Sequence, residues 1–122
     1  MPVAPPFKQG MVDVRDVAKI FLGALESDNT IGKRIFVAEG TYWVKDFCQM
    51  LIDIGHKAPT FTPPIFLVKF LSNFDKGLKQ ILPLLGVDME INTDIAKTLL
   101  NFKPIPIRET IKETSDYISS YD

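Results

Sequence analysis

The sequence has no glycine-rich loop. Its seven glycines are spread along the chain, and no two of them lie closer than eight residues. A loop that cradles a phosphate needs several glycines within a few residues, because only then can backbone N–H groups approach the anion closely. We therefore expect that this chain alone binds no dinucleotide cofactor, and we predict no cofactor-binding residue in it.

A tyrosine–lysine pair for proton transfer is also missing. None of the three tyrosines is followed by lysine four positions later, since Asp46 and Tyr121 stand there after Tyr42 and Tyr117. A tyrosinate held by a lysine one helical turn away cannot be built locally. We predict no catalytic residue in the chain.

Cysteine and histidine occur once each, as Cys48 and His56. A lone thiol excludes an internal disulfide and is typical of proteins from a reducing compartment. Two residues fall short of the three or four protein ligands that hold zinc. A buried thiol and a loop histidine are the favoured interpretation, and no metal site is predicted.

Charge of one sign and long apolar runs are lacking as well. The 14 basic and 15 acidic residues leave a formal net charge of -1, so we expect no nucleic-acid partner. The most apolar stretch, PIFLVKFLSNF, contains Lys69 and is too short to span a bilayer. The proline-rich start, MPVAPPFKQG, lacks the apolar segment of a secretory signal. We therefore expect a cytoplasmic chain without a membrane partner.

The first half of the chain alternates strand and helix patterns, which is typical of α/β construction. A short strand is predicted at Met11–Val14, followed by a helix through Glu26. A second strand is predicted at Ile35–Ala38, buried on both faces as in a parallel sheet. Thr41 is predicted to cap the next helix, and Gly55 to end it.

The second half is mostly helical. Prolines 63 and 64 open a first helical piece, a second piece ends near Gly86, and VDMEI is a short strand candidate. Asn92 or Thr93 is expected to cap a helix, and Ile107, Ile111 and Ile118 mark one side of the last one. The length of 122 residues predicts a single domain over residues 1–122. The predicted fold class is α/β, with few short strands and about five or six helices.

Asp13 and Asp16 admit two interpretations. They lie at the predicted start of the first helix, where a carboxylate caps free N–H groups and meets the positive end of the dipole. A pair of carboxylates also suits general acid/base chemistry. Capping is the favoured interpretation, with Arg15 solvated or ion-paired between them. Glu109 and Glu113 are expected on a solvated helix face.

Three ordered blocks resemble a known family. They are MVDVRDVAKIFLGALE, IGKRIFVAEGTYWVKDFCQML and INTDIAKTLLNFKPIPIRETIKETSDYI. Together they resemble the C-terminal part of extended short-chain dehydrogenases/reductases, within the dihydroflavonol reductase-like, NAD-dependent epimerase/dehydratase group. The resemblance covers residues 1 to about 117.

The resemblance implies a fragment of an extended Rossmann-type enzyme. In the intact family the N-terminal part holds the glycine-rich turn and the Ser/Tyr/Lys set, whereas the C-terminal part supplies a last sheet strand and a substrate-binding lobe. RIFVAEG then resembles that strand, and Asp13 and Asp16 cap a helix at the seam between the lobes. NAD or NADP is implied for the intact enzyme, and the isolated chain is expected to be inactive.

The substrate implied by this resemblance is a small ketone or aldehyde. Nucleotide-sugar members often carry an arginine just before the segment matching MVDV, but Gln9 and Gly10 stand there, with Lys8 the nearest cation. That departure argues against a nucleotide sugar. An apolar wall suits an uncharged carbonyl compound better, although the same side chains would also serve as lobe core. The pocket candidates are Phe61, Ile65, Phe66 and Phe70.

Two functions from different classes follow. The first is the substrate-binding portion of an NAD(P)-dependent oxidoreductase. The second is a free-standing, non-catalytic binding or interaction module from a truncated gene. Under either, an uncovered sheet edge and helix face predict a homo-oligomer or strand exchange.

Overall fold

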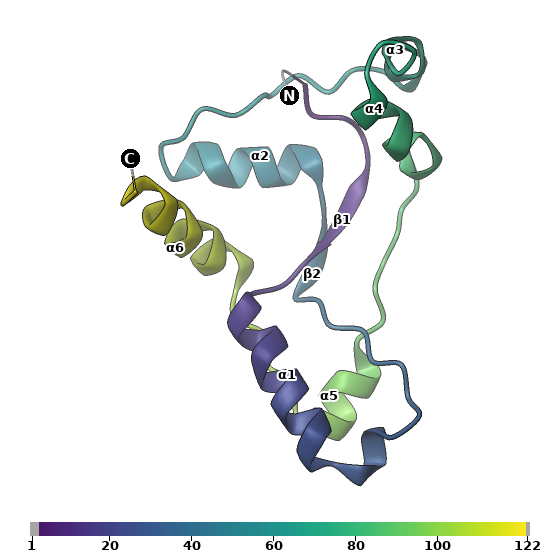
Figure 1. The fold of residues 1–122 in the computed structure, drawn as a ribbon. Coiled ribbons are helices and arrows are strands. Elements are labelled where there is room, and N and C mark those ends of the chain that lie inside the picture. Colours follow the sequence, from purple (N-terminus) through teal and green to yellow (C-terminus); the bar gives the residue numbers. More distant parts are fainter. Residues whose placement is uncertain (1–2, 122) are drawn as a thin grey trace. The chain divides into compact units, whose positions relative to one another are not determined.

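The computed structural model describes residues 3–121, which form six α-helices, two short 3₁₀ helices and two β-strands (Figure 1). The predicted α/β class with few short strands is confirmed. The chain divides into two compact units. Unit 1 comprises Met1–Gln9 and Tyr42–Met89, and unit 2 comprises Gly10–Thr41 and Glu90–Asp122. The single-domain organisation stays a prediction.

The two strands, β1 (Lys8–Met11) and β2 (Gly40–Trp43), form one sheet, and each passes from one unit into the other. Met11 O accepts a hydrogen bond from Glu39 N at 2.7 Å, and Phe7 O accepts one from Val44 N at 3.1 Å. Because the partners run in opposite order along the chain, the pairing is antiparallel.

Both strand predictions need correction. The strand expected at Met11–Val14 ends at Met11, because Asp13 already caps the helix that follows. Ile35–Ala38 is not a strand, because the ladder with β1 begins only at Glu39. Ile35 and Val37 instead pack individually against the core of unit 2, while Phe36 is exposed.

Unit 2 holds α1 (Val14–Glu26), α5 (Asp94–Leu100) and α6 (Ile107–Ser119), with a 3₁₀ turn at Asp28–Thr30. Its hydrophobic core consists of Ile20, Ala96 and Phe102, and half-buried apolar side chains surround it. Ile107 and Ile111 of α6 are buried as expected, but Ile118 is exposed.

Unit 1 holds α2 (Val44–Asp53), α3 (Ile65–Leu71) and α4 (Lys76–Ile81), with a 3₁₀ turn at Leu82–Leu84. Pro64 precedes α3, and Gly55 follows α2 with a positive φ of 95°, both as predicted. Thr41 was expected to cap α2, but it lies inside β2, and α2 begins only after Trp43.

The segment before α5 also differs from its prediction. VDMEI forms no strand, because residues 87–91 have no ladder partner. Ile91 instead lies against Gly10, where an added Cβ would come within 2.2 Å of the Ile91 Cδ1. Between the two cap candidates, Asn92 accepts the bond from Asp94 N at 2.8 Å, whereas the Thr93 side chain makes no cap bond.

Candidate functional site

The start of α1 is organised by the Asp13 carboxylate. Asp13 has an extended backbone, and its Oδ1 accepts from Arg15 N at 2.8 Å, which is a helix N-cap bond. The same carboxylate accepts from Arg15 Nε at 2.9 Å and Nη2 at 2.8 Å, and from Thr110 Oγ1 at 2.8 Å. The Arg15 guanidinium holds the pKa of the Asp13 carboxyl well below its usual range, because those bonds favour the charged form. Asp13 is therefore an ionised structural anchor.

Asp16, in the first turn of the same helix, binds a different part of the chain. It is only 2% exposed, and its Oδ2 accepts from Ile105 N at 2.8 Å. Ile105 lies between Pro104 and Pro106, and prolines have no backbone N–H, so this is the one donor of the three residues. Asp16 thus fixes the loop that leads into α6. Asp13 caps α1, as the favoured interpretation has it, whereas Asp16 was expected to cap the same helix and instead accepts from Ile105 N. Their place at a lobe seam stays a prediction.

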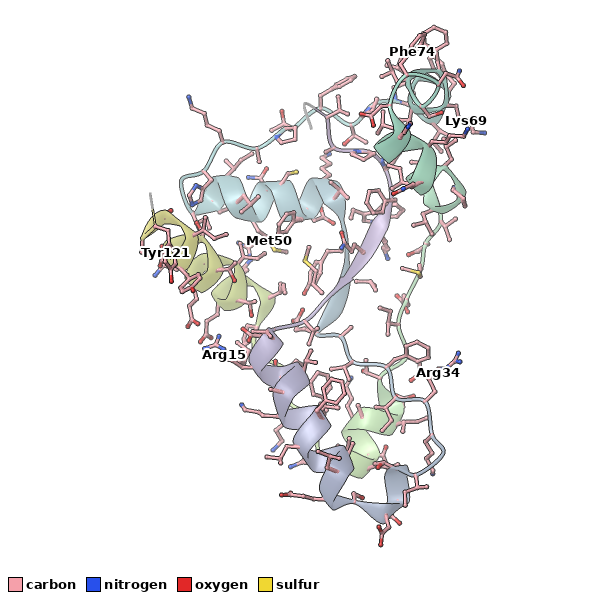
Figure 2. The ribbon with its side chains drawn as sticks, viewed as in Figure 1. Arg15, Arg34, Met50, Lys69, Phe74 and Tyr121 are labelled. Carbon is pink, nitrogen blue, oxygen red and sulfur yellow. The ribbon has the colours of Figure 1, made fainter. Side chains whose placement is uncertain are left out.

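Arg15, labelled in Figure 2, lines an open groove of about 530 Å³. Its Nη2 pairs with Asp13 at 2.8 Å and with Glu113 of α6 at 2.7 Å. Glu113, expected on a solvated face, therefore belongs to an ion-pair cluster. Because two carboxylates already neutralise the guanidinium, the groove offers no free cation for an anionic ligand. The cluster ties the start of α1 to α6.

The four pocket candidates all belong to unit 1. Phe61 belongs to the extended segment before α3, where its carbonyl accepts from Ala4 N at 2.9 Å. Ile65, Phe66 and Phe70 are on α3 itself. Phe61, Phe66 and Phe70 are all more than half exposed, and Val68 is the buried residue of this helix. These rings are therefore a surface rather than the core of the unit.

The structure adds residues that the sequence did not single out. Phe74, labelled in Figure 2, is exposed and meets Phe70 edge to face with ring centroids 5.9 Å apart. A separate cavity of about 180 Å³ is lined by Pro5, Pro6, Trp43, Lys45, Asp46 and Thr62. In the sequence, the one feature that pointed to this cavity is that Trp43 is the sole tryptophan.

Lys8, the cation nearest to Gln9 and Gly10, already has two partners. Its ammonium pairs with Asp88 and lies over the Trp43 ring, 5.4 Å from the centroid. Binding a substrate phosphate would require Lys8 to leave both partners. The sequence argument against a nucleotide sugar stays a prediction.

The described part of the chain has neither a cluster of metal ligands nor a membrane-spanning helix. Within residues 3–121, no group of three or more His, Cys, Asp and Glu side chains is arranged to hold a metal ion. In the same part of the chain, no helix combines the length and the apolar character needed to cross a bilayer.

We expect the Cys48 thiol to resist modification. Cys48 is buried in α2, and burial raises the pKa of the thiol, so less of the reactive thiolate is present. At pH 8 a thiol-specific dye should react at least about tenfold more slowly with the folded chain than with the chain in urea. Because the sequence has one cysteine, each molecule gives one signal. Equal rates would contradict the burial.

The chain matches only part of the length of the known proteins that it resembles. No family model matches the sequence. The chain is 30% identical over 118 residues to the NADPH-dependent methylglyoxal reductase GRE2 of Saccharomyces cerevisiae. This alignment covers 97% of the chain and 31% of the reductase. Its fold matches part of the crystal structure of gox2253 with a TM-score of 0.76 and 20% identity, over 99% of this chain and 40% of that one. The chain is thus similar to part of an oxidoreductase.

Proposed function

We propose that the chain is the substrate-binding C-terminal portion of an NAD(P)-dependent oxidoreductase that acts on a small ketone or aldehyde. The more specific assignment is to the extended short-chain dehydrogenases/reductases, dihydroflavonol reductase-like. The observation that carries the proposal is the 30% identity to an NADPH-dependent methylglyoxal reductase over nearly the whole chain. Methylglyoxal is itself small and uncharged and contains both a ketone and an aldehyde.

The residues of this chain do not fit a dinucleotide by themselves. A pyrophosphate binds best at a helix N-terminus that presents free N–H groups. The N-termini of α1 and α4 carry the capping carboxylates of Asp13 and Asp75, which would repel it, whereas those of α2 and α6 have no side-chain cap. No two glycines lie close enough to form a phosphate loop. The absence of a phosphate loop supports the proposal that this chain does not carry out hydride transfer by itself, and we expect the isolated chain not to oxidise NADPH.

The chain would contribute an apolar wall around the carbonyl compound. The rings of Phe61, Phe66 and Phe70 are exposed on unit 1, and Phe66 and Phe70 lie one helical turn apart on α3 with Ile65. Apolar side chains of this kind bury the carbon atoms of a small ligand and exclude water from a site. Their part in catalysis is binding rather than bond making.

A segment exchange tests this function. The part of the yeast reductase that aligns with this chain is replaced by the chain, and NADPH oxidation with methylglyoxal is followed by absorbance. The folded chimera should be active, whereas the isolated chain should be inactive.

Phe66→Ala with Phe70→Ala in the chimera should raise KM at least about fivefold with a smaller change in kcat. Phe36→Ala, an exposed phenylalanine of unit 2, is the matched control. An inactive but folded chimera would contradict the proposal.

A further inference from the structure

Two tyrosines meet at the end of α6. Tyr117 lies near the end of the helix, and Tyr121 follows it four residues later. Their hydroxyl oxygens are 2.8 Å apart and share a hydrogen bond. The rings meet edge to face, with centroids 5.0 Å apart and planes at 73° to each other. Residues four apart lie on the same side of a helix, so the spacing itself brings the two phenols together.

The pair is held in place although both side chains are open to solvent. Tyr117 is 63% exposed and Tyr121 is 73% exposed. Ser120 N donates to the carbonyl of Asp116 at 3.1 Å, and Tyr121 N donates to that of Ile118 at 3.1 Å. These bonds continue the helical turn as far as Tyr121. The hydrogen bond with Tyr117 raises the pKa of the Tyr121 hydroxyl. The two phenols therefore combine a fixed contact with open access.

Phenols in contact have a characteristic reaction under one-electron oxidation. The unpaired electron of a phenoxyl radical is shared between its oxygen and the ring carbons ortho to that oxygen. Because the hydroxyl groups of Tyr117 and Tyr121 touch, the ortho carbons beside them also lie close together. Both rings are exposed, so the protein around them does not block the short approach that a carbon–carbon bond requires.

We propose that Tyr117 and Tyr121 form an oxidative cross-linking site, at which hydrogen peroxide activated by a haem peroxidase joins them into dityrosine within one chain. Each phenol gives one electron and its hydroxyl proton to the oxidant and becomes a phenoxyl radical. The radicals couple through their ortho carbons, and the hydrogen on each of these carbons moves to the ring oxygen and restores the phenol. The chain loses two hydrogen atoms in total, while one hydrogen peroxide is reduced to two water molecules.

The contact favours a bond within the chain over a bond between two copies. Groups held side by side react as if at an effective concentration far above that of separate molecules in dilute solution. The remaining tyrosine, Tyr42, is half-buried in β2 and belongs to unit 1. The proposed site lies in unit 2 and uses none of the pocket candidates, so the inference stands independently of the proposed function.

Peroxidase oxidation of the full chain, followed by trypsin and mass spectrometry, tests the site. Trypsin cuts after Lys112, and no lysine or arginine follows, so both tyrosines stay in the peptide ETSDYISSYD. The peptide contains no methionine or cysteine, whose oxidation would add oxygen. Its mass should fall by two hydrogen atoms, with dityrosine fluorescence. The fraction cross-linked should stay the same when the chain is diluted about tenfold, because the reaction is intramolecular.

Four variants locate the bond. Tyr117→Phe and Tyr121→Phe should each abolish the loss of mass, whereas Tyr42→Phe should leave it unchanged. The geometric control combines Ile118→Tyr with Tyr121→Phe, which keeps two tyrosines in the same peptide at neighbouring positions. Neighbouring side chains of a helix do not face each other, so its yield should be at least about fivefold lower. Ile118 is exposed, and far-UV circular dichroism checks that each variant is folded.

Three results would overturn the proposal. They are a wild-type peptide of unchanged mass, a cross-linked fraction that falls on dilution, and equal yields from the wild type and the geometric control. The second result would show that the bond joins two copies. The third would show that closeness in sequence, rather than the helical contact between Tyr117 and Tyr121, is enough for the reaction.

Discussion

Replacing Phe102 by alanine should lower the free energy of unfolding by about 3–5 kcal/mol, which is the usual loss for a buried phenylalanine. Phe102 is 7% exposed and packs on Ile20 and Ala96 in the core of unit 2. The truncation removes most of the aromatic surface of a three-residue core and leaves a cavity that fixed neighbours cannot fill. Domains of this size have only about 5–15 kcal/mol of stability, so unit 2 should be unfolded or nearly so.

Urea titration followed by far-UV circular dichroism measures this loss. The matched control is Phe36→Ala, which makes the same chemical change in unit 2 at a side chain that is more than half exposed. It should cost less than about 1 kcal/mol. A Phe102→Ala chain that unfolds at the same urea concentration as the control would show that this core does not hold the unit together.

Replacing Asp13 by asparagine should destabilise the chain by about 2 kcal/mol at pH 7, in the range for hydrogen bonds to a charged group. Asparagine keeps an oxygen that can cap α1. It loses the negative charge that receives the Arg15 guanidinium and the Thr110 hydroxyl. The cap survives while the bond between α1 and α6 weakens, so the effect reports the ion-pair cluster rather than the helix end.

The same substitution should flatten the acid dependence of stability. The folded chain holds the pKa of Asp13 well below its ordinary value of 3.8. The stabilisation is therefore complete above that value and is lost as the pH falls through it toward the lower folded pKa. Between about pH 5 and pH 2, the wild-type chain should lose more stability than Asp13→Asn. Glu113→Gln, whose carboxylate is half exposed, is the comparison and should change the profile less. Parallel profiles for wild type and Asp13→Asn would contradict the assignment.

The sequence predicted local features well because their causes are local. The start of α1 at Asp13 and the turn at Gly55 each depend on residues within one helical turn of the boundary. The same holds for the opening of α3 after Pro64. The α/β class followed from the alternation of such elements.

Features that depend on distant partners could not be predicted. Ile35–Ala38 has the composition of a buried strand, but strand formation needs a ladder partner, and here the ladder with β1 begins one residue later. The site shows the same limit. The hydrogen bond between Asp16 and Ile105 joins residues 89 positions apart, and that between Asp13 and Thr110 joins residues 97 positions apart. No local sequence pattern predicts either contact. The pocket candidates are exposed apolar side chains, and periodicity alone does not distinguish exposed apolar residues from core residues.

The single tryptophan allows the unfolding of unit 1 to be followed separately by fluorescence. Trp43 belongs to unit 1, while the Ile20, Ala96 and Phe102 core of unit 2 has no strong fluorophore. Emission therefore reports the melting of one unit, whereas helical ellipticity sums over both. Comparing the two curves in a single sample shows, without any label, whether the halves melt together or in succession.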